Sequence, residues 1–164
     1  MKRIALINDV TGYSRCSIAA QLPIISAMGI ECVFVPTAIL SVNTMHPEYY
    51  FDDYTDRMND YIETYKKMKV SFDGIATGFL GSERQIDIVI DFIKTFKKKH
   101  TFVLVDPVMG DHGKLYPTYT TAMQDKMRQL IPYATIMTPN LTELCALLEV
   151  PYPVSYTHLT LPTT

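Results

Sequence analysis

The chain has 164 residues, of which 48% are hydrophobic and 20% are charged; this balance is typical of a globular domain and excludes a disordered chain. The formal net charge of -2 argues against nucleic acid as the main partner, because phosphate-binding surfaces are usually basic. The three cysteines are widely spaced, and no apolar stretch is long enough to cross a bilayer or to act as a signal sequence. We therefore expect free thiols, a cytoplasmic location and no membrane partner.

Short apolar segments alternate with segments of helical periodicity along the chain. The apolar segments predict strands at residues 2–7, 30–36, 72–76, 101–105 and 134–137. The periodic segments predict helices at residues 14–28, 52–69, 82–96, 119–130 and 140–148. Such alternation predicts an α/β fold with a parallel sheet built from right-handed βαβ units.

Polar or glycine-rich loops follow four of the predicted strands. In an open parallel sheet, ligands bind outside the carboxyl ends of the strands. We therefore expect these loops to meet at one edge of the sheet and to form a ligand site. The four loops span residues 8–13, 77–82, 106–116 and 138–143.

Two aspartates and two glycines mark the loop after the fourth predicted strand. Asp106 and Asp111 can hold a hydrated Mg²⁺, which prefers oxygen ligands, although an aspartate here can equally cap a turn. Gly110 and Gly113 would let the backbone turn tightly and approach a phosphate. Lys114 can neutralise a phosphate, but an exposed loop lysine needs no function.

Asn140 and Glu143 lie one turn apart at the start of the last predicted helix. This spacing is that of a capping box in slightly altered form. It also allows both side chains to face one metal ion or phosphate, and a helix N-terminus attracts anions. The two interpretations are compatible.

Several common sites are missing from the sequence. There is no G-x-x-x-x-G-K-[ST] sequence, no G-x-G-x-x-G sequence after the first predicted strand, and no zinc-like spacing of histidines. These absences argue against a P-loop protein, a dinucleotide-binding Rossmann domain and a zinc protein. Residues 154–164 carry no acidic or basic residue apart from His158, and we expect this tail to be foreign to the domain or disordered.

Blocks of sequence resemble the bacterial pyridoxal/pyridoxamine kinases of the ribokinase-like superfamily, and they occur in the family's order. The resemblance covers about residues 1–153 and implies a truncated three-layer ribokinase-like sandwich with a mostly parallel sheet. The matching blocks are residues 7–17 with 22–24, 41–44, 77–82, 106–111 and 138–143.

This resemblance implies ATP-dependent phosphorylation of the 5′-hydroxymethyl group of a B6 vitamer, with Mg²⁺ and with K⁺ as an open further requirement. Phe79 would lie against the pyridine ring. The resemblance assigns the vitamer pocket to Asn8, Asp9, Asn43, Thr44 and Phe79. It assigns Mg²⁺ to Asp106, Asp111 and Glu143, partly through water, and the ATP phosphates to Asp111, Lys114, Tyr116, Thr138 and Asn140. The loop at residues 112–119 would form part of a flap over ATP.

The family's Gly-Thr-Gly-Asp block, which supplies the general base and the anion hole, does not occur in the sequence. We therefore expect no residue of this chain to act as the general base, and we expect the chain alone to be very slow or inactive and marginally soluble. The resemblance implies a homodimer for the full-length protein. Three alternatives stay open: another ribokinase-like kinase, for example of hydroxymethylpyrimidine; a non-catalytic vitamer- or nucleotide-binding fragment; and a generic flavodoxin-like binding module.

Overall fold

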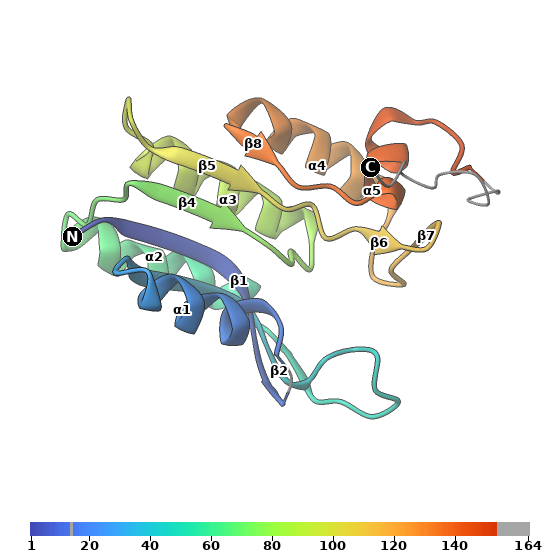
Figure 1. The fold of residues 1–164 in the computed structure, drawn as a ribbon, viewed down its shortest axis with the longest axis horizontal. Coiled ribbons are helices and arrows are strands. Elements are labelled where there is room, and N and C mark those ends of the chain that lie inside the picture. The colour runs from blue at the N-terminus through green and yellow to red at the C-terminus, as the bar shows by residue number, and fades with distance from the viewer. Residues whose placement is uncertain (14, 154–164) are drawn as a thin grey trace, which may run out of the picture.

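The computed structural model describes residues 1–13 and 15–153, so the predicted tail at 154–164 lies outside the described residues. A six-stranded sheet with the order β3-β2-β1-β4-β5-β8 forms its centre, and only β2 and β3 pair in an antiparallel way (Figure 1). The strands of this sheet are β1 (Arg3–Tyr13), β2 (Glu31–Val42), β3 (Phe51–Asp53), β4 (Gly74–Thr77), β5 (Phe102–Val105) and β8 (Ile136–Met137). The predicted α/β fold with a mostly parallel sheet is confirmed.

Five helices and a small hairpin accompany the sheet. The hairpin consists of β6 (Gly110–Asp111) and β7 (Lys114–Leu115). The helices are α1 (Ser17–Ala27), α2 (Thr55–Lys67), α3 (Glu83–Phe96), α4 (Thr121–Leu130) and α5 (Leu141–Leu148), and a 3₁₀ turn, η1, covers Ile131–Tyr133. Within residues 1–13 and 15–153, no helix combines the length and the apolar character that a membrane span requires.

The strands divide their side chains between two hydrophobic clusters, as the period of two in a strand dictates. Ile7, Ile75 and Val105 belong to the larger cluster, which includes apolar residues of α2, α3 and α4. Leu6 and Ala76, their neighbours in sequence, form the smaller cluster with Ile18 of α1. Helices therefore lie on both faces of the sheet, with more of them on the first face.

Two strands are longer than the sequence predicts. Residues 8–13 were expected to form a loop, but β1 continues through them to Tyr13, paired with β2 as far as Val42. The register shifts between Asn8 and Val10, which leaves Asp9 at a bulge. The prediction was wrong because asparagine, aspartate and glycine are rare in strands, whereas here the ladder between β1 and β2 satisfies the backbone despite these residues.

The predicted helix boundaries differ by a few residues at the amino ends. The first helix begins at Ser17 rather than at residue 14, and Cys16 occupies its N-cap position; the predicted cap Ser14 lies outside the described residues. The second helix begins at Thr55 because the preceding residues form β3. Ser82 does cap α3, since its side chain accepts a hydrogen bond from the Gln85 amide.

Candidate functional site at the carboxyl ends of the strands

The loop after β4, residues 77–82, is called the Phe79 loop below. Asn8, which is 6% exposed, joins this loop to β1: its Oδ1 accepts a hydrogen bond from the Phe79 amide at 2.8 Å. Its Nδ2 donates to Gln21 Oε1 at 3.3 Å. The side chain of Asn8 lies so close that a Cβ on Gly78 would be 2.3 Å from its Cγ. The close approach of β1 and the Phe79 loop therefore favours glycine at this position.

The Phe79 ring is half-buried and stands edge-on to the Phe51 ring, with 6.4 Å between the centroids. Phe51 comes from β3, which pairs with β2. Two aromatic rings from different segments therefore meet at this edge of the sheet. Such a surface can pack against a flat, partly apolar ligand ring.

The other residues assigned to the vitamer pocket lie on β1 and after β2. Asp9 is 6% exposed, and its Oδ2 accepts a hydrogen bond from Thr11 Oγ1 at 2.6 Å. Asn43 is half-buried and accepts a hydrogen bond from the Met45 amide at 3.1 Å, while Thr44 is exposed. Asp9 is thus held inside the protein, whereas Asn43 and Thr44 lie in the more open segment beyond β2.

Asp106, directly after β5, and Glu143, in the first turn of α5, carry carboxylates that lie near each other. Burial, and then the negative charge of Glu143, raise the pKa of Asp106 to about 6, and a hydrogen bond with Thr138 acts in the opposite direction. Thr138 directly follows β8, and Asp106 directly follows β5. Oxygen atoms therefore gather at the ends of two neighbouring strands. A bound cation would relieve the repulsion between the Asp106 and Glu143 carboxylates. Asp106 and Glu143 are called the carboxylate pair below.

Glu143 is 4% exposed, and backbone amides bind both of its oxygens. Its Oε1 accepts from Met109 and its Oε2 from Asn140, each at 2.9 Å. In return, Asn140 Oδ1 accepts from the Glu143 amide at 3.0 Å, which completes a capping box. The capping interpretation of these residues is confirmed.

The same capping residues fasten α5 to the loop that carries Asp106. Asn140 Nδ2 donates to the Gly110 carbonyl at 2.7 Å. Between Asp106 and the Met109 amide held by Glu143, Val108 has a φ of 46°. A β-branched residue rarely adopts this left-handed conformation, so the surrounding contacts must hold it there.

The hairpin β6–β7 needs both of its glycines. His112 and Gly113 have φ values of 50° and 76°, as a two-residue hairpin turn with the strand twist requires. A Cβ on Gly110 would lie 2.3 Å from the Lys114 carbonyl oxygen. Asp111 and Lys114 are exposed on this hairpin, and the prediction of a tight, glycine-dependent turn is confirmed.

The pKa of Tyr116 responds to all three predicted metal ligands. Burial raises the pKa of its hydroxyl, and the charges of Asp111, Glu143 and Asp106 raise that pKa further, in this order of size. All three carboxylates therefore lie near enough to the Tyr116 hydroxyl for their charges to affect its pKa. Nevertheless, in residues 1–13 and 15–153 no three acidic, histidine or cysteine side chains gather closely enough to hold a metal ion. The chemistry fits Mg²⁺, which is commonly bound by one or two carboxylates together with substrate phosphates.

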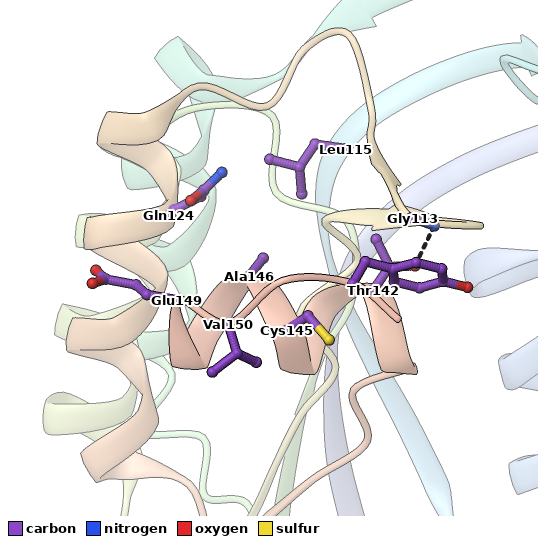
Figure 2. Close-up of a pocket in the computed structure, with 9 residues that line it drawn as sticks. Gly113, Leu115, Gln124, Thr142, Cys145, Ala146, Glu149 and Val150 are labelled. Atoms are coloured by element: carbon purple, nitrogen blue, oxygen red, sulfur yellow. Dashed lines mark hydrogen bonds between the residues drawn. The ribbon is translucent and has the colours of Figure 1, made fainter. Parts of the chain in front are cut away.

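A pocket of about 290 Å³ lies behind the hairpin, between α4, α5 and the segment after α5. Figure 2 shows Thr142 and Cys145 of α5 on its floor, and the hydrogen bond of 2.9 Å from the Gly113 amide to Thr142 Oγ1. This bond anchors the tip of the hairpin to α5. Besides Thr142, the polar side chains of Gln124 and Glu149 line the pocket.

Sequence reasoning missed two buried polar residues, Gln85 and Thr37, which are both 0% exposed. Gln85 falls on the buried stripe of α3 with Val89 and Phe92. A polar residue within an apolar helical stripe is the signal that could have drawn attention to Gln85. Thr37 had no such signal, because the strand β2 was predicted to end before it.

The family model described as phosphomethylpyrimidine kinase matches residues 16–158 of the chain. The chain belongs to this family. A pyridoxine/pyridoxal/pyridoxamine kinase of Bordetella avium is 32% identical over 149 residues, which are 82% of this chain and 47% of the relative. The chain therefore spans about half the length of this relative.

Solved structures that are similar to this chain support its assignment to this family. The proposed phosphomethylpyrimidine kinase of Bacteroides thetaiotaomicron is 46% identical, with a TM-score of 0.92 over 95% of this chain and 54% of its own; an orthorhombic crystal of it contained pyridoxal. The pyridoxal kinase of Lactobacillus plantarum is 26% identical, with a TM-score of 0.89 over 94% of this chain and 55% of its own. The resemblance to pyridoxal kinases and the ribokinase-like fold are both confirmed.

Proposed function

We propose that this chain carries the vitamer- and phosphate-binding edge of a kinase that transfers a phosphoryl group from ATP to the 5′-hydroxymethyl group of a B6 vitamer. The observation that carries the proposal is the position of two complementary features at the ends of neighbouring strands. An aromatic loop follows β4, and a carboxylate pair begins directly after β5. The pyridoxal bound by the Bacteroides thetaiotaomicron relative supports the same substrate class.

On the vitamer side, the ring of Phe79 would pack against the pyridine ring. Asp9, Asn43 and Thr44 would supply the polar contacts around it. Asn8 would act mainly by holding the Phe79 amide, because its side-chain atoms already bind Phe79, Asp9 and Gln21.

On the phosphate side, Asp106 and Glu143 would hold Mg²⁺, with Asp111 contributing through water. When bound, Mg²⁺ neutralises charge that develops on the transferring phosphoryl group. Phosphate oxygens would be approached by Asp111, Lys114, Tyr116, Thr138 and Asn140, with ATP as the phosphoryl donor. These residues position and neutralise the substrate, which is the main work of a protein in phosphoryl transfer.

The proton of the vitamer hydroxyl needs an acceptor that we do not assign to this chain. The resemblance places this general base in a Gly-Thr-Gly-Asp block, which the printed sequence does not contain. We therefore propose that the chain alone binds its ligands but turns over very slowly. Homodimeric assembly of the full-length protein and a cytoplasmic location remain part of this proposal, and a requirement for K⁺ stays open.

Calorimetric titration with pyridoxal, pyridoxamine and hydroxymethylpyrimidine tests the substrate class. We expect saturable binding of a B6 vitamer and weaker binding of hydroxymethylpyrimidine. A parallel titration with MgATP should lose affinity in Asp106→Asn but not in Asp60→Asn, which removes an exposed carboxylate from α2. Equal MgATP affinity in the two variants would contradict the phosphate side of the proposal.

Phosphorylation of hydroxymethylpyrimidine is the second candidate, because the matching family model is described as phosphomethylpyrimidine kinase. The reaction class is the same, and a related ring would occupy the surface beside Phe79. Tighter binding of hydroxymethylpyrimidine than of any B6 vitamer would favour this candidate. If neither the B6 vitamers nor hydroxymethylpyrimidine bind, both candidate functions are contradicted.

A further inference from the structure

We propose that Thr37 and Gln85 are positioning residues that fix the backbone of the Phe79 loop and thereby orient the Phe79 ring for its substrate. This inference rests on the proposed function for the identity of the substrate. It goes beyond that proposal, because neither residue belongs to the vitamer or phosphate contacts described above.

The Phe79 backbone is held from both sides. Its amide donates to Asn8 Oδ1 at 2.8 Å, and its carbonyl oxygen accepts from Thr37 Oγ1 at 2.8 Å. Asn8 lies on β1 and Thr37 on β2, so two strands of the sheet fix one peptide segment. Since both polar groups of Phe79 are occupied, its Cα–Cβ bond has a fixed direction.

Gln85 fixes the loop at a second point, two residues further along the chain. Its Oε1 accepts from the Gly81 amide at 2.7 Å. Its Nε2 donates to the Thr37 carbonyl and to Thr55 Oγ1, each at 2.8 Å. One buried side chain therefore connects the Phe79 loop to β2 and to the first residue of α2.

These contacts also set the position of the second aromatic ring. Gln85 Nε2 lies 3.3 Å from Oδ1 of Asp53, the last residue of β3. Phe51, at the start of β3, meets Phe79 edge-on. The network thus holds the two rings in relation to each other, and a buried, fully hydrogen-bonded network of this kind favours one geometry.

The removal of one hydroxyl group tests the inference. Thr37→Val deletes the donor to the Phe79 carbonyl, and Thr37→Ser keeps it. Thr101→Val is the control: Thr101 is also buried, its Oγ1 donates to the Phe72 carbonyl at 2.9 Å, and the same atom accepts from the Lys98 amide at 3.0 Å. Thr101 directly precedes β5, at the amino ends of the strands and away from the proposed site.

Two measurements are made on the full chain. Amide hydrogen exchange, followed by NMR without ligand, should be about fivefold faster at Phe79 in Thr37→Val, as expected for the loss of one hydrogen bond. The Kd for pyridoxal should rise by about the same factor. Thr37→Ser should restore both values, Thr101→Val should change neither, and the Kd for MgATP should stay the same in all three variants.

Each result decides the inference. Unchanged exchange at Phe79 in Thr37→Val, or an equal rise of the pyridoxal Kd in Thr101→Val, would overturn it. A rise of the MgATP Kd together with the pyridoxal Kd would also overturn it, because it would show general damage instead of local positioning. If the unmodified chain binds no pyridoxal, the proposed function fails, while the exchange rates still decide whether Thr37 fixes the loop.

Discussion

The Phe79 loop and the segment from Asp106 to Tyr116 follow neighbouring strands, yet opposite forces shape them. Hydrogen bonds hold the backbone of the first at Phe79 and Gly81, where Asn8, Thr37 and Gln85 are the partners. The second buries a carboxylate beside a like charge: burial, and then the negative charge of Glu143, raise the pKa of Asp106 to about 6. The side that we propose binds the ring is therefore preorganised, whereas burial and like charge disfavour the ionised carboxylates on the side that we propose binds phosphate.

Gln85→Leu should break the preorganised side most severely. The change leaves the Gly81 amide and the Thr37 carbonyl without their buried partner, so we expect a loss of about 3 kcal/mol in the free energy of unfolding. Urea denaturation measures this loss. Gln129→Leu, on the exposed side of α4, should change stability by less than about 0.5 kcal/mol; similar losses in both variants would contradict the role of the network.

Gly78→Ala should have the next largest effect. The new Cβ would lie 2.3 Å from Asn8 Cγ, so Asn8 must move and its bond to the Phe79 amide must weaken. We expect a cost of about 2 kcal/mol, seen as a lower melting temperature, together with weaker pyridoxal binding.

Gly81→Ala is the control in the same loop. The nearest atom to its new Cβ would be Phe79 Cε1 at 3.5 Å, an ordinary van der Waals distance. We expect a small change in its melting temperature. If Gly81→Ala destabilises the chain as much as Gly78→Ala, the loop is sensitive to any side chain, and the close approach to Asn8 is not the reason.

The stability of the chain should depend on pH because of Asp106. The pKa of Asp106 is about 6 in the folded chain and 3.8 as its ordinary value, so the folded state binds more protons between these values. Stability should therefore fall as the pH rises from about 4 to about 7. A shift of this size corresponds to about 3 kcal/mol, and partial exposure reduces it to about 1 kcal/mol.

Asp106→Asn should remove this fall and stabilise the chain by about 1 kcal/mol at pH 8, while it weakens binding of MgATP. Melting temperatures between pH 4 and pH 8 measure the effect, and Asp60→Asn serves as the charge-removal control. An unchanged pH dependence in Asp106→Asn would show that the titration of Asp106 is not the cause of the fall.

Thr142→Val should produce the smallest effect. It removes the acceptor of the Gly113 amide at 2.9 Å, so the tip of the hairpin should loosen while α5 stays intact. We expect about 1 kcal/mol or less, and faster hydrogen exchange at Gly113 than at Asn140. Unchanged exchange at Gly113 would mean that the hairpin is held by other contacts.

The sequence predicted the sheet, the helices and the edge where the candidate site lies, because apolar periodicity and strand order determine them. It missed the extension of β1 and β2, since the pairing of two strands overrides the low strand preference of residues such as Asn8 and Gly12. It named Asp106, Asp111 and Glu143 as candidate metal ligands, and that assignment stays a prediction. The capping box predicted the bond from the Asn140 amide to Glu143, but not the bond from the Met109 amide, which comes from a separate segment.

Gln85 also shows what sequence can and cannot predict about a buried polar residue. Its position on an apolar stripe is visible in the sequence, but its partners lie on β2, on α2 and in the Phe79 loop. Local periodicity can therefore indicate that such a residue is unusual. Only the three-dimensional arrangement shows which backbone groups it satisfies.

The left-handed conformation of Val108 would link the proposed ion site to the conformation of the main chain. Glu143 holds the neighbouring Met109 amide, and thereby helps to keep Val108 at a φ of 46°. An incoming divalent ion that draws Glu143 toward itself would weaken this restraint and let residues 106–110 relax. The free energy released by that relaxation would offset part of the cost of breaking the bond between Glu143 and the Met109 amide, so binding of the ion would be coupled to the conformation of this segment.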